Sequence, residues 1–278
     1  MPPPSPESTE ALLQTAETVA QEAGALLAQH FLEKREVSFK GGIDLVTDAD
    51  TLSEARVLEL LRARHPTHAI LSEEAGLAEE GSHTYRWIVD PLDGTTNYAH
   101  KLPHFSVSIA VELHGQVVAG AVYDPMRREL FSAGRGLGAT LNGARVRPSS
   151  VTELIRALLC TGFPYNVHQD SAAPLGLLTR MLHKAQGIRR LGSAALDLCY
   201  VASGRLDGYF EFSLKPWDMA AGALIVEESG GSMTTLEGKP WSLLHGDVLA
   251  SAPGISESLK AECQTFLNEL GLKGARLQ

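Results

Sequence analysis

Cysteine is scarce in this chain. Only three of the 278 residues are cysteines, and they lie far apart, at Cys160, Cys199 and Cys263. An odd number of cysteines without metal-type spacing excludes a disulfide framework and a zinc site built on thiolates. We therefore expect three buried free thiols in a protein of a reducing compartment, and the cytoplasm is the expected location.

Long apolar runs and an excess of positive charge are also missing. No apolar run approaches the ~20 residues that a membrane helix needs. Lys and Arg total 24 against 33 Asp and Glu, a net charge of -9, so counterion release would not drive nucleic-acid binding. We expect no membrane partner and no nucleic-acid partner. A phosphorylated substrate stays compatible with this charge, provided that metal cations invert the field locally.

The first residues, MPPPSPE, lack the basic end and the apolar stretch of a secretory signal. Their prolines favour a short disordered leader over residues 1–8. From there the chain alternates between helix and strand patterns. Helical spacing of apolar residues predicts helices over residues 8–33 and 49–64. Short β-rich segments predict strands over residues 69–71, 87–89, 105–113, 116–123 and 129–133.

The second half alternates strands and helices more regularly. Strands are predicted over residues 157–161, 187–191, 207–212 and 248–251, and helices over 193–203 and 219–229, with a terminal helix to follow. No Pro- or Ser-rich linker divides the halves. We therefore expect two subdomains that share a crevice, an α+β unit over residues 9–150 and an α/β unit over residues 151–278.

Carboxylates at the ends of predicted strands carry the strongest chemical signal. Asp90 and Asp93 flank Pro91-Leu92 directly after the apolar strand 87–89, so that the turn brings two carboxylates together. The small residues of the following GTTN segment, residues 94–97, have backbone N–H groups that can face an anion at a helix start. Glu73 follows another short strand, and Asp218 begins a predicted helix. Oxygen ligands of this kind suit magnesium and do not suit zinc.

Four segments together resemble the inositol monophosphatase family. Residues 87–98, WIVDPLDGTTNY, resemble its first signature, and residues 217–222, WDMAAG, running on to ESGG at 228–231, resemble its second. The segments DLVTDAD at 44–50 and Glu73-Glu74 also match, in the expected order along the chain. The resemblance spans nearly the whole chain and implies a layered αβαβα sandwich of the inositol monophosphatase and fructose-1,6-bisphosphatase type.

The same resemblance implies a metal site with two to three magnesium ions. Glu73, Asp90 and the carbonyl of Leu92 would hold the first ion. Asp90, Asp93 and Asp218 would hold the second, with Asp90 as the bridge, and a weaker third ion would lie beside Glu73. Inhibition by lithium and assembly as a homodimer are further properties that the family implies.

The implied catalytic residues are Thr95, Asp50 and Glu73. Thr95, hydrogen-bonded to Asp50, would orient the attacking water, and the N–H groups of Gly94 and Thr95 would bind the phosphate. The substrate hydroxyls would contact four residues, Gly192, Ser193, Ala194 and Glu211. The implied reaction is in-line hydrolysis of a phosphomonoester without a covalent enzyme intermediate.

The substrate stays open at this point. DGTTN together with Glu211 favours a small polyol phosphate, myo-inositol 1-phosphate first. Fructose 1,6-bisphosphate, histidinol phosphate and a 3'-phosphonucleotide are alternatives within the same fold. A metal-binding regulatory protein without catalysis is an alternative of another class, and the intact ligand set counts against it. The roles of Lys40 and of Arg189-Arg190 also stay open.

Overall fold

The computed structural model describes residues 7–31, 37–39, 45–78 and 82–271. Residues 1–6 of the expected leader, Lys40, Asp44 and the last residues lie outside these ranges. The end of the leader is placed, because the side chain of Ser8 accepts a hydrogen bond from the Ala11 N–H and caps the first helix. Among the described helices, none is both long and apolar enough to cross a membrane.

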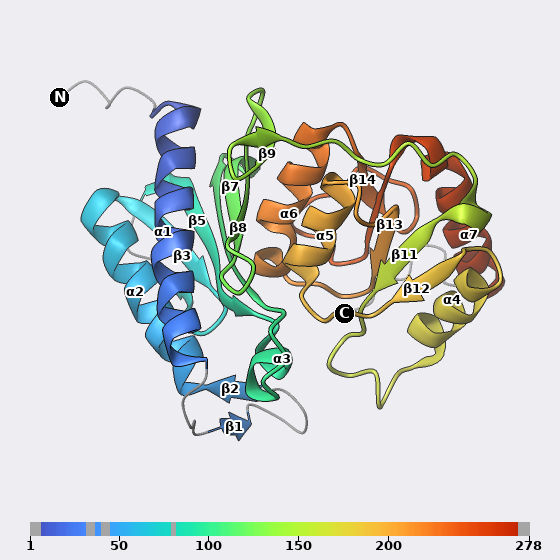
Figure 1. The fold of residues 1–278 in the computed structure, drawn as a ribbon, viewed down its shortest axis with the longest axis horizontal. Helices are drawn as coiled ribbons and strands as arrows, with labels where there is room; N and C mark the ends of the chain where they lie inside the picture. The colour runs from blue at the N-terminus through green and yellow to red at the C-terminus, as the bar shows by residue number, and fades with distance from the viewer. Residues whose placement is uncertain (1–6, 32–36, 40–44, 79–81, 272–278) are drawn as a thin grey trace.

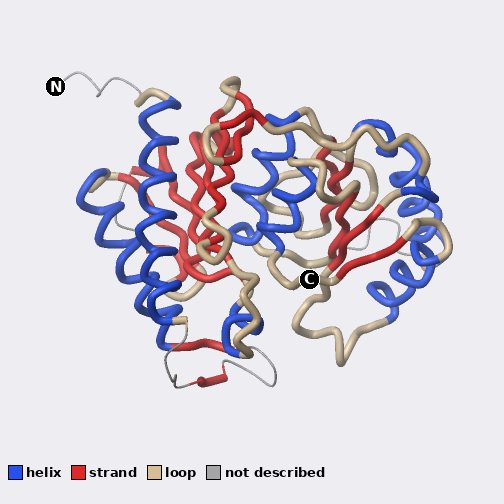
Figure 2. Tube along the Cα trace, viewed as in Figure 1, coloured by secondary structure: helices blue, strands red, loops and turns tan. Residues whose placement is uncertain are grey.

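Helices and sheets stack in the order α-β-α-β-α (Figures 1 and 2). Helices α1 (Thr9–His30) and α2 (Asp48–Arg64) cover the outer face of the first sheet. Helices α5 (Ala194–Ala202) and α6 (Pro216–Ser229) lie between the two sheets. Helices α4 (Ala172–Leu182) and α7 (Ser256–Glu269) cover the outer face of the second sheet. This is the layered sandwich that the resemblance implies.

The first sheet has eight strands in the order β10-β9-β8-β7-β6-β5-β3-β4. Neighbouring strands are antiparallel except β3 and β5, which are parallel. Their bounds are β3 (His68–Ser72), β4 (Gly76–Ala78), β5 (Ser82–Asp93), β6 (Ser106–Leu113), β7 (Gln116–Asp124), β8 (Glu129–Gly134), β9 (Gly138–Leu141) and β10 (Ala144–Arg145). The short pair β1 (Val37–Phe39) and β2 (Leu45–Thr47) and the one-turn helix α3 (Thr95–Ala99) lie at one end of this sheet (Figure 1).

The second sheet has five strands in the order β12-β11-β13-β15-β14. They are β11 (Leu158–Thr161), β12 (Gly187–Arg189), β13 (Gly208–Glu211), β14 (Ser232–Thr235) and β15 (Val248–Ser251). Strand β11 is parallel to β12 and β13, whereas β15 is antiparallel to β13 and β14. Half of this sheet therefore follows the βαβ pattern that alternating strands and helices predict, and the edge with β14 does not.

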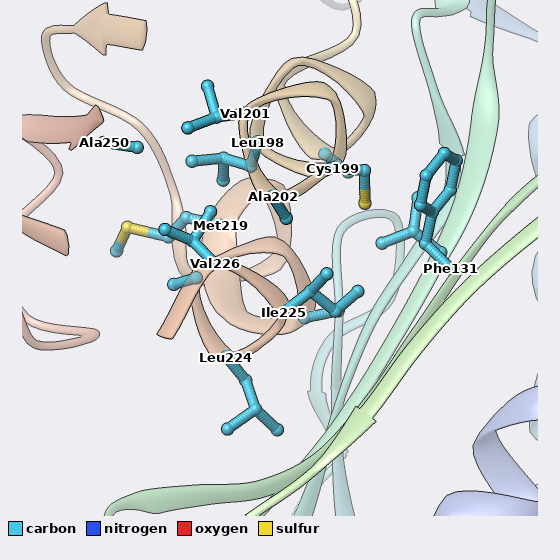
Figure 3. Packing of buried hydrophobic residues seen from close by; sticks show 14 of the residues in the cluster. Phe131, Leu198, Cys199, Val201, Ala202, Met219, Leu224, Ile225, Val226 and Ala250 are labelled. Carbon is cyan, nitrogen blue, oxygen red and sulfur yellow. The ribbon is translucent and has the colours of Figure 1, made fainter. Parts of the chain in front are cut away.

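Each interface between layers has its own hydrophobic core. On β5, Trp87 and Val89 join the cluster under α1 and α2, and Ile88 joins the cluster around α5 and α6. Both faces of the first sheet are thus buried, as strand alternation requires. Figure 3 shows the central cluster, to which Phe131 of the first sheet and Ile225 of α6 both belong. Because helices of the second half pack on the sheet of the first, the two halves share one core.

Four elements show how the structure differs from the predictions. Strand β5 does not stop at Asp90 but continues to Asp93, with a register irregularity between these residues. Pro91 has no N–H to donate and is tolerated at such a bulge. Helix α6 begins at Pro216 and not at residue 219, since proline suits the first helical position. Helix α4 and strand β14 were not predicted, and Pro174 with Gly176 weakens the helical pattern of α4.

Candidate active site

The bulge in β5 positions the first two carboxylates. Asp90 pairs with Ser108 of β6 and Asp93 pairs with Ser106, so that one extra residue lies on β5 between the two pairs. The Leu92 N–H donates to Oδ1 of Asp90 at 3.0 Å, which closes a tight turn around Pro91. Both carboxylates are buried. A bulge that changes the direction of side chains is a recurrent device beside active sites.

Asp93 ties the first sheet to helix α5. Its Oδ2 accepts hydrogen bonds from the Ser193 hydroxyl at 2.5 Å, from the Ala195 N–H at 2.9 Å and from the Ser106 hydroxyl at 3.4 Å. Ser193 does not cap the helix with its own side chain, so the carboxylate of Asp93 satisfies this helix N-terminus, where negative charge is favourable. The Ser193 side chain, expected at the substrate, therefore holds Asp93.

One face of helix α2 holds the loops that carry the site. Asp50, Ser53 and Glu54 have the i, i+3 and i+4 spacing of neighbours on a helix, and all three are buried. The Ser53 hydroxyl donates to the Pro91 carbonyl at 2.7 Å. Glu54 Oε1 accepts from the Ser72 hydroxyl at 2.5 Å and from the Ala75 N–H at 2.9 Å. Glu54 therefore clamps both ends of the turn that carries Glu73.

Neither Ser53 nor Glu54 was singled out from the sequence. The available signal was their spacing after Asp50, because three polar residues on a buried helix face need partners. Asn97 was also missed. Its Nδ2 donates to the carbonyls of His104 at 2.8 Å and of Leu191 at 2.9 Å, which fixes the loop before α5 against the segment after β5.

Thr95 lies between two acceptors. Its hydroxyl is 3.1 Å from Oδ1 of Asp50 and 3.0 Å from the carbonyl of Leu92. A hydroxyl has one proton to donate, so it can serve one of these acceptors at a time. The expected contact between Thr95 and Asp50 is present. Gly94 precedes Thr95 with φ of +96°, a conformation that favours glycine.

Glu73, Asp218 and Glu211 line one cavity of about 630 Å³. Glu73 follows β3 and is half-buried, while Asp218 lies in the first turn of α6. Oδ2 of Asp218 accepts the Lys215 N–H at 2.6 Å, which fixes the start of that helix. The cavity is also bounded by residues 163–166, 212–217, 243–244 and 246–247. The end of β3, helix α6 and strand β13 thus contribute Glu73, Asp218 and Glu211, and Asp247 before β15 adds a fourth carboxylate.

The carboxylates repel one another at a site where Asp90 and Asp93 are buried and Glu73 and Asp218 are half-buried. Burial raises the pKa of Asp90 well above its usual value, and the charges of Glu73, Asp93 and Asp218 raise it further. Burial also raises the pKa of Asp93 to about 6, against hydrogen bonds that lower it. The pKa of Asp218 is raised by burial first and by Glu73 and Asp93 in addition. The charges of Glu73, Asp93 and Asp218 thus act on the buried Asp90.

The donor set fits a hard cation. Glu73, Asp90, Asp93 and Asp218 offer carboxylate oxygens, and the Leu92 carbonyl lies beside them through its contact with Thr95. Magnesium and calcium prefer oxygen ligands of this type, whereas zinc prefers nitrogen and sulfur. A divalent cation would also remove the repulsion that raises these pKa values.

A second group of metal-type residues lies elsewhere, at the C-terminal end of α2. Ligand atoms of Glu7, His65 and His68 lie within 4.8 Å of one another. The indole N–H of Trp87 donates to Nδ1 of His68 at 3.1 Å, so the proton of the neutral ring must lie on Nε2. That atom faces Glu7 at 3.2 Å and has no lone pair to offer a metal. The group therefore holds Glu7 by hydrogen bonds.

The structure also places the cysteines and the two arginines that the sequence analysis named. Cys160, Cys199 and Cys263 are free and buried, as predicted. Arg189 and Arg190 are exposed. A Cβ on Gly192 would lie 2.7 Å from Nη1 of Arg190, which places that guanidinium group beside the segment expected to contact the substrate.

The raised pKa values predict how the stability of the metal-free protein varies with pH. Between about pH 4 and pH 7 the folded state holds protons on these acids that the unfolded state has lost, so they contribute stability that disappears as pH rises. His68 and His104 oppose this trend, since their pKa values are lowered by burial. We therefore compare the wild type with Asp90→Asn by urea unfolding in chelator at pH 5 and pH 8. The variant should gain stability relative to the wild type at pH 8. A difference in unfolding free energy between the two proteins that is the same at pH 5 and pH 8 would contradict repulsion among the carboxylates.

The whole chain is similar to known proteins. It is 42% identical to Nus factor SuhB of Escherichia coli K12 over 93% of this chain and 97% of the relative. The solved inositol monophosphatase of Anabaena (Nostoc) superposes with a TM-score of 0.84 at 39% identity, over 92% of this chain and 96% of that one. SaIMPase-II, solved with inositol monophosphate bound, gives a TM-score of 0.79 at 26% identity, over 95% and 97% of the two chains.

The names of these relatives give different roles. The sequence pattern of the inositol monophosphatase family matches residues 8–268. Membership of that family supports a metal-dependent phosphatase, in keeping with the oxygen-only donor set. On the match over nearly its entire length, this chain belongs to the inositol monophosphatase family.

Proposed function

We propose that this protein is a magnesium-dependent phosphatase of small polyol phosphates, with myo-inositol 1-phosphate as the preferred substrate. The observation that carries the proposal is the convergence of Glu73, Asp90, Asp93 and Asp218 beside a cavity that also contains Glu211. The first four would hold two to three magnesium ions together with the Leu92 carbonyl. Glu211 would bind the alcohol part of the substrate.

The residues around the metal site have different proposed roles. Bound magnesium would neutralise phosphate charge and would bring the pKa of a bound water down towards neutral pH. When the Thr95 hydroxyl donates to Asp50, its oxygen can accept a hydrogen bond from a water and so orient it. The backbone N–H groups of Gly94 and Thr95, and Glu73 at the edge of the cavity, complete the proposed site.

Two features support a hydroxyl-rich substrate. Glu211 is buried at the end of β13, and a carboxylate can accept hydrogen bonds from neighbouring hydroxyls. Gly192 and Ala194, which we propose as further substrate contacts, lie in the segment that Asn97 fixes beside Asp93. The related SaIMPase-II holds inositol monophosphate. A cavity of about 630 Å³ also leaves room for the alternatives, fructose 1,6-bisphosphate, histidinol phosphate and a 3'-phosphonucleotide.

A purely regulatory role is the alternative of another class. The name Nus factor belongs to the Escherichia coli relative. In this chain the oxygen donors and the contact between Thr95 and Asp50 are intact, which supports an enzyme. We further propose a cytoplasmic homodimer that is sensitive to lithium and binds neither nucleic acid nor membranes.

A phosphate-release assay tests this function. With magnesium, the wild type should release phosphate from inositol 1-phosphate with a higher kcat/KM than from glycerol 2-phosphate or histidinol phosphate. Activity should disappear after exhaustive chelation and return on adding magnesium, because the donor set binds hard cations. Full activity without metal would overturn the metal site. A tenfold preference for histidinol phosphate would overturn the substrate and leave the metal site standing.

Thr95 and Asp50 should act as a unit. Thr95→Ala should lower kcat by ~10²–10⁴-fold with little change in KM, since orientation of the water matters in the transition state. Asp50→Asn should give a similar loss, and the double variant should be little worse than either single variant. Thr96→Ala, which changes the exposed neighbour on α3, is the matched control. Strictly multiplicative losses would contradict the pair.

A further inference from the structure

Two residues outside the metal site lie against the carboxylate of Glu211: Tyr209 donates a hydrogen bond to it, and Gly162 leaves space for it. Tyr209 and Glu211 stand two positions apart on β13, so their side chains leave the same face of the strand. The Tyr209 hydroxyl donates a short hydrogen bond to Oε2 of Glu211. Tyr209 is fully buried and belongs to the core around α5 and α6. Packing therefore fixes the ring, and the ring fixes one carboxylate oxygen.

Gly162 provides the space on the other side. This residue directly follows β11, which is parallel to β13 and pairs Thr161 with Phe210. A Cβ on Gly162 would lie 2.1 Å from Oε2 of Glu211 and 2.4 Å from both Cδ and Oε1. Any side chain at this position would therefore push the carboxylate away. The φ of Gly162 is not among the positive values, so space and not backbone conformation requires the glycine.

Tyr209, with the space beside Gly162, is the positioning device by which we propose that this protein selects polyol phosphates. It acts through Glu211 and does not touch the substrate itself. The inference rests on the proposed function, since it takes Glu211 as the group that binds the substrate hydroxyls. The phenol hydroxyl occupies Oε2 of the carboxylate, so Oε1 is the oxygen that we expect to accept hydrogen bonds from substrate hydroxyl groups.

Charge makes this hydrogen bond decisive near neutral pH. Burial raises the pKa of Glu211 to about 7, and the Tyr209 hydroxyl lowers it because it donates to the ionised form. The charged groups that face this pair come from β5, α5, α6 and the loop before α5, and they are Asp93, Asp197, Asp218 and Arg190. Asp93 raises the pKa of Glu211 and Arg190 lowers it. Removal of the phenol hydroxyl should therefore leave less carboxylate ionised at pH 7.

The test uses Tyr209→Phe, which keeps the ring and removes the hydroxyl. At pH 7 with saturating magnesium, kcat/KM for inositol 1-phosphate should fall about tenfold, the size of one lost hydrogen bond to a charged group. For 4-nitrophenyl phosphate, which has no hydroxyls beside its phosphate, the change should stay below about twofold. The rise of kcat/KM for inositol 1-phosphate with pH should also move to higher pH in the variant.

Further variants test whether the effect is specific to the contact between Tyr209 and Glu211. Tyr85→Phe removes another buried phenol hydroxyl, which accepts a hydrogen bond from the Glu7 N–H at 3.1 Å and lies far from the site. This variant should leave kcat/KM unchanged for both substrates. In a Glu211→Gln background, Tyr209→Phe should add little, since the carboxylate that it positions is gone. Gly162→Ala should reproduce the selective loss, and urea unfolding shows whether each variant is folded.

The possible failures separate cleanly. Suppose that the wild type prefers inositol 1-phosphate but Tyr209→Phe lowers kcat/KM equally for both substrates, or leaves the pH profile unchanged. The positioning role is then wrong, and the proposed function stands. If the wild type hydrolyses neither compound with magnesium, the proposed function is wrong and this inference falls with it. A selective loss together with the shifted profile supports both.

Discussion

Mutual repulsion among buried carboxylates is the constraint on which the rest of this structure depends. Glu73, Asp93 and Asp218 raise the pKa of Asp90, and Glu73 and Asp93 also raise that of Asp218. Without a cation such a cluster destabilises the folded protein at neutral pH. The fold must therefore hold the acids in place with other contacts. A cation with oxygen preference then gains a preorganised site.

Those contacts come from every layer around the site. Helix α2 supplies Ser53 and Glu54, which hold the turn after Asp90 and the turn that carries Glu73. Helix α5 supplies its N-terminus to Asp93, and the N-terminal turn of α6 includes Asp218 itself. Since α5 and α6 lie between the two sheets, the site is complete only when both sheets stack. The packing of the central core therefore also positions the site.

The sequence predicted the parts of this arrangement that are local. Helical and strand periodicity located α1, α2 and the strands that carry the acids, because these patterns reflect burial on one or two faces. The DGTTN segment indicated the carboxylates, and family resemblance gave the layered fold. The bulge that carries β5 on to Asp93 was not predicted, because a bulge depends on pairing with β6 and not on the residues of one strand.

The missed contacts are those between distant segments. Glu54 meets Ser72 and Ala75, Asn97 meets Leu191, and the Glu211 carboxylate lies against Gly162, which follows the neighbouring strand β11. A single sequence shows the polar residues but not their partners. Burial of Asp50, Ser53 and Glu54 on one helix face became visible only with the sheet in place.

Magnesium binding to the metal-stripped protein tests the central claim most directly. Calorimetric titration of the wild type with magnesium should show saturable binding, because the acids are held together in advance. Asp90→Asn, which removes the charge at the centre of the cluster, should weaken that binding by at least about tenfold, a loss typical of perturbed metal sites. Wild-type protein that takes up no magnesium, or a variant with the same isotherm, would contradict the account.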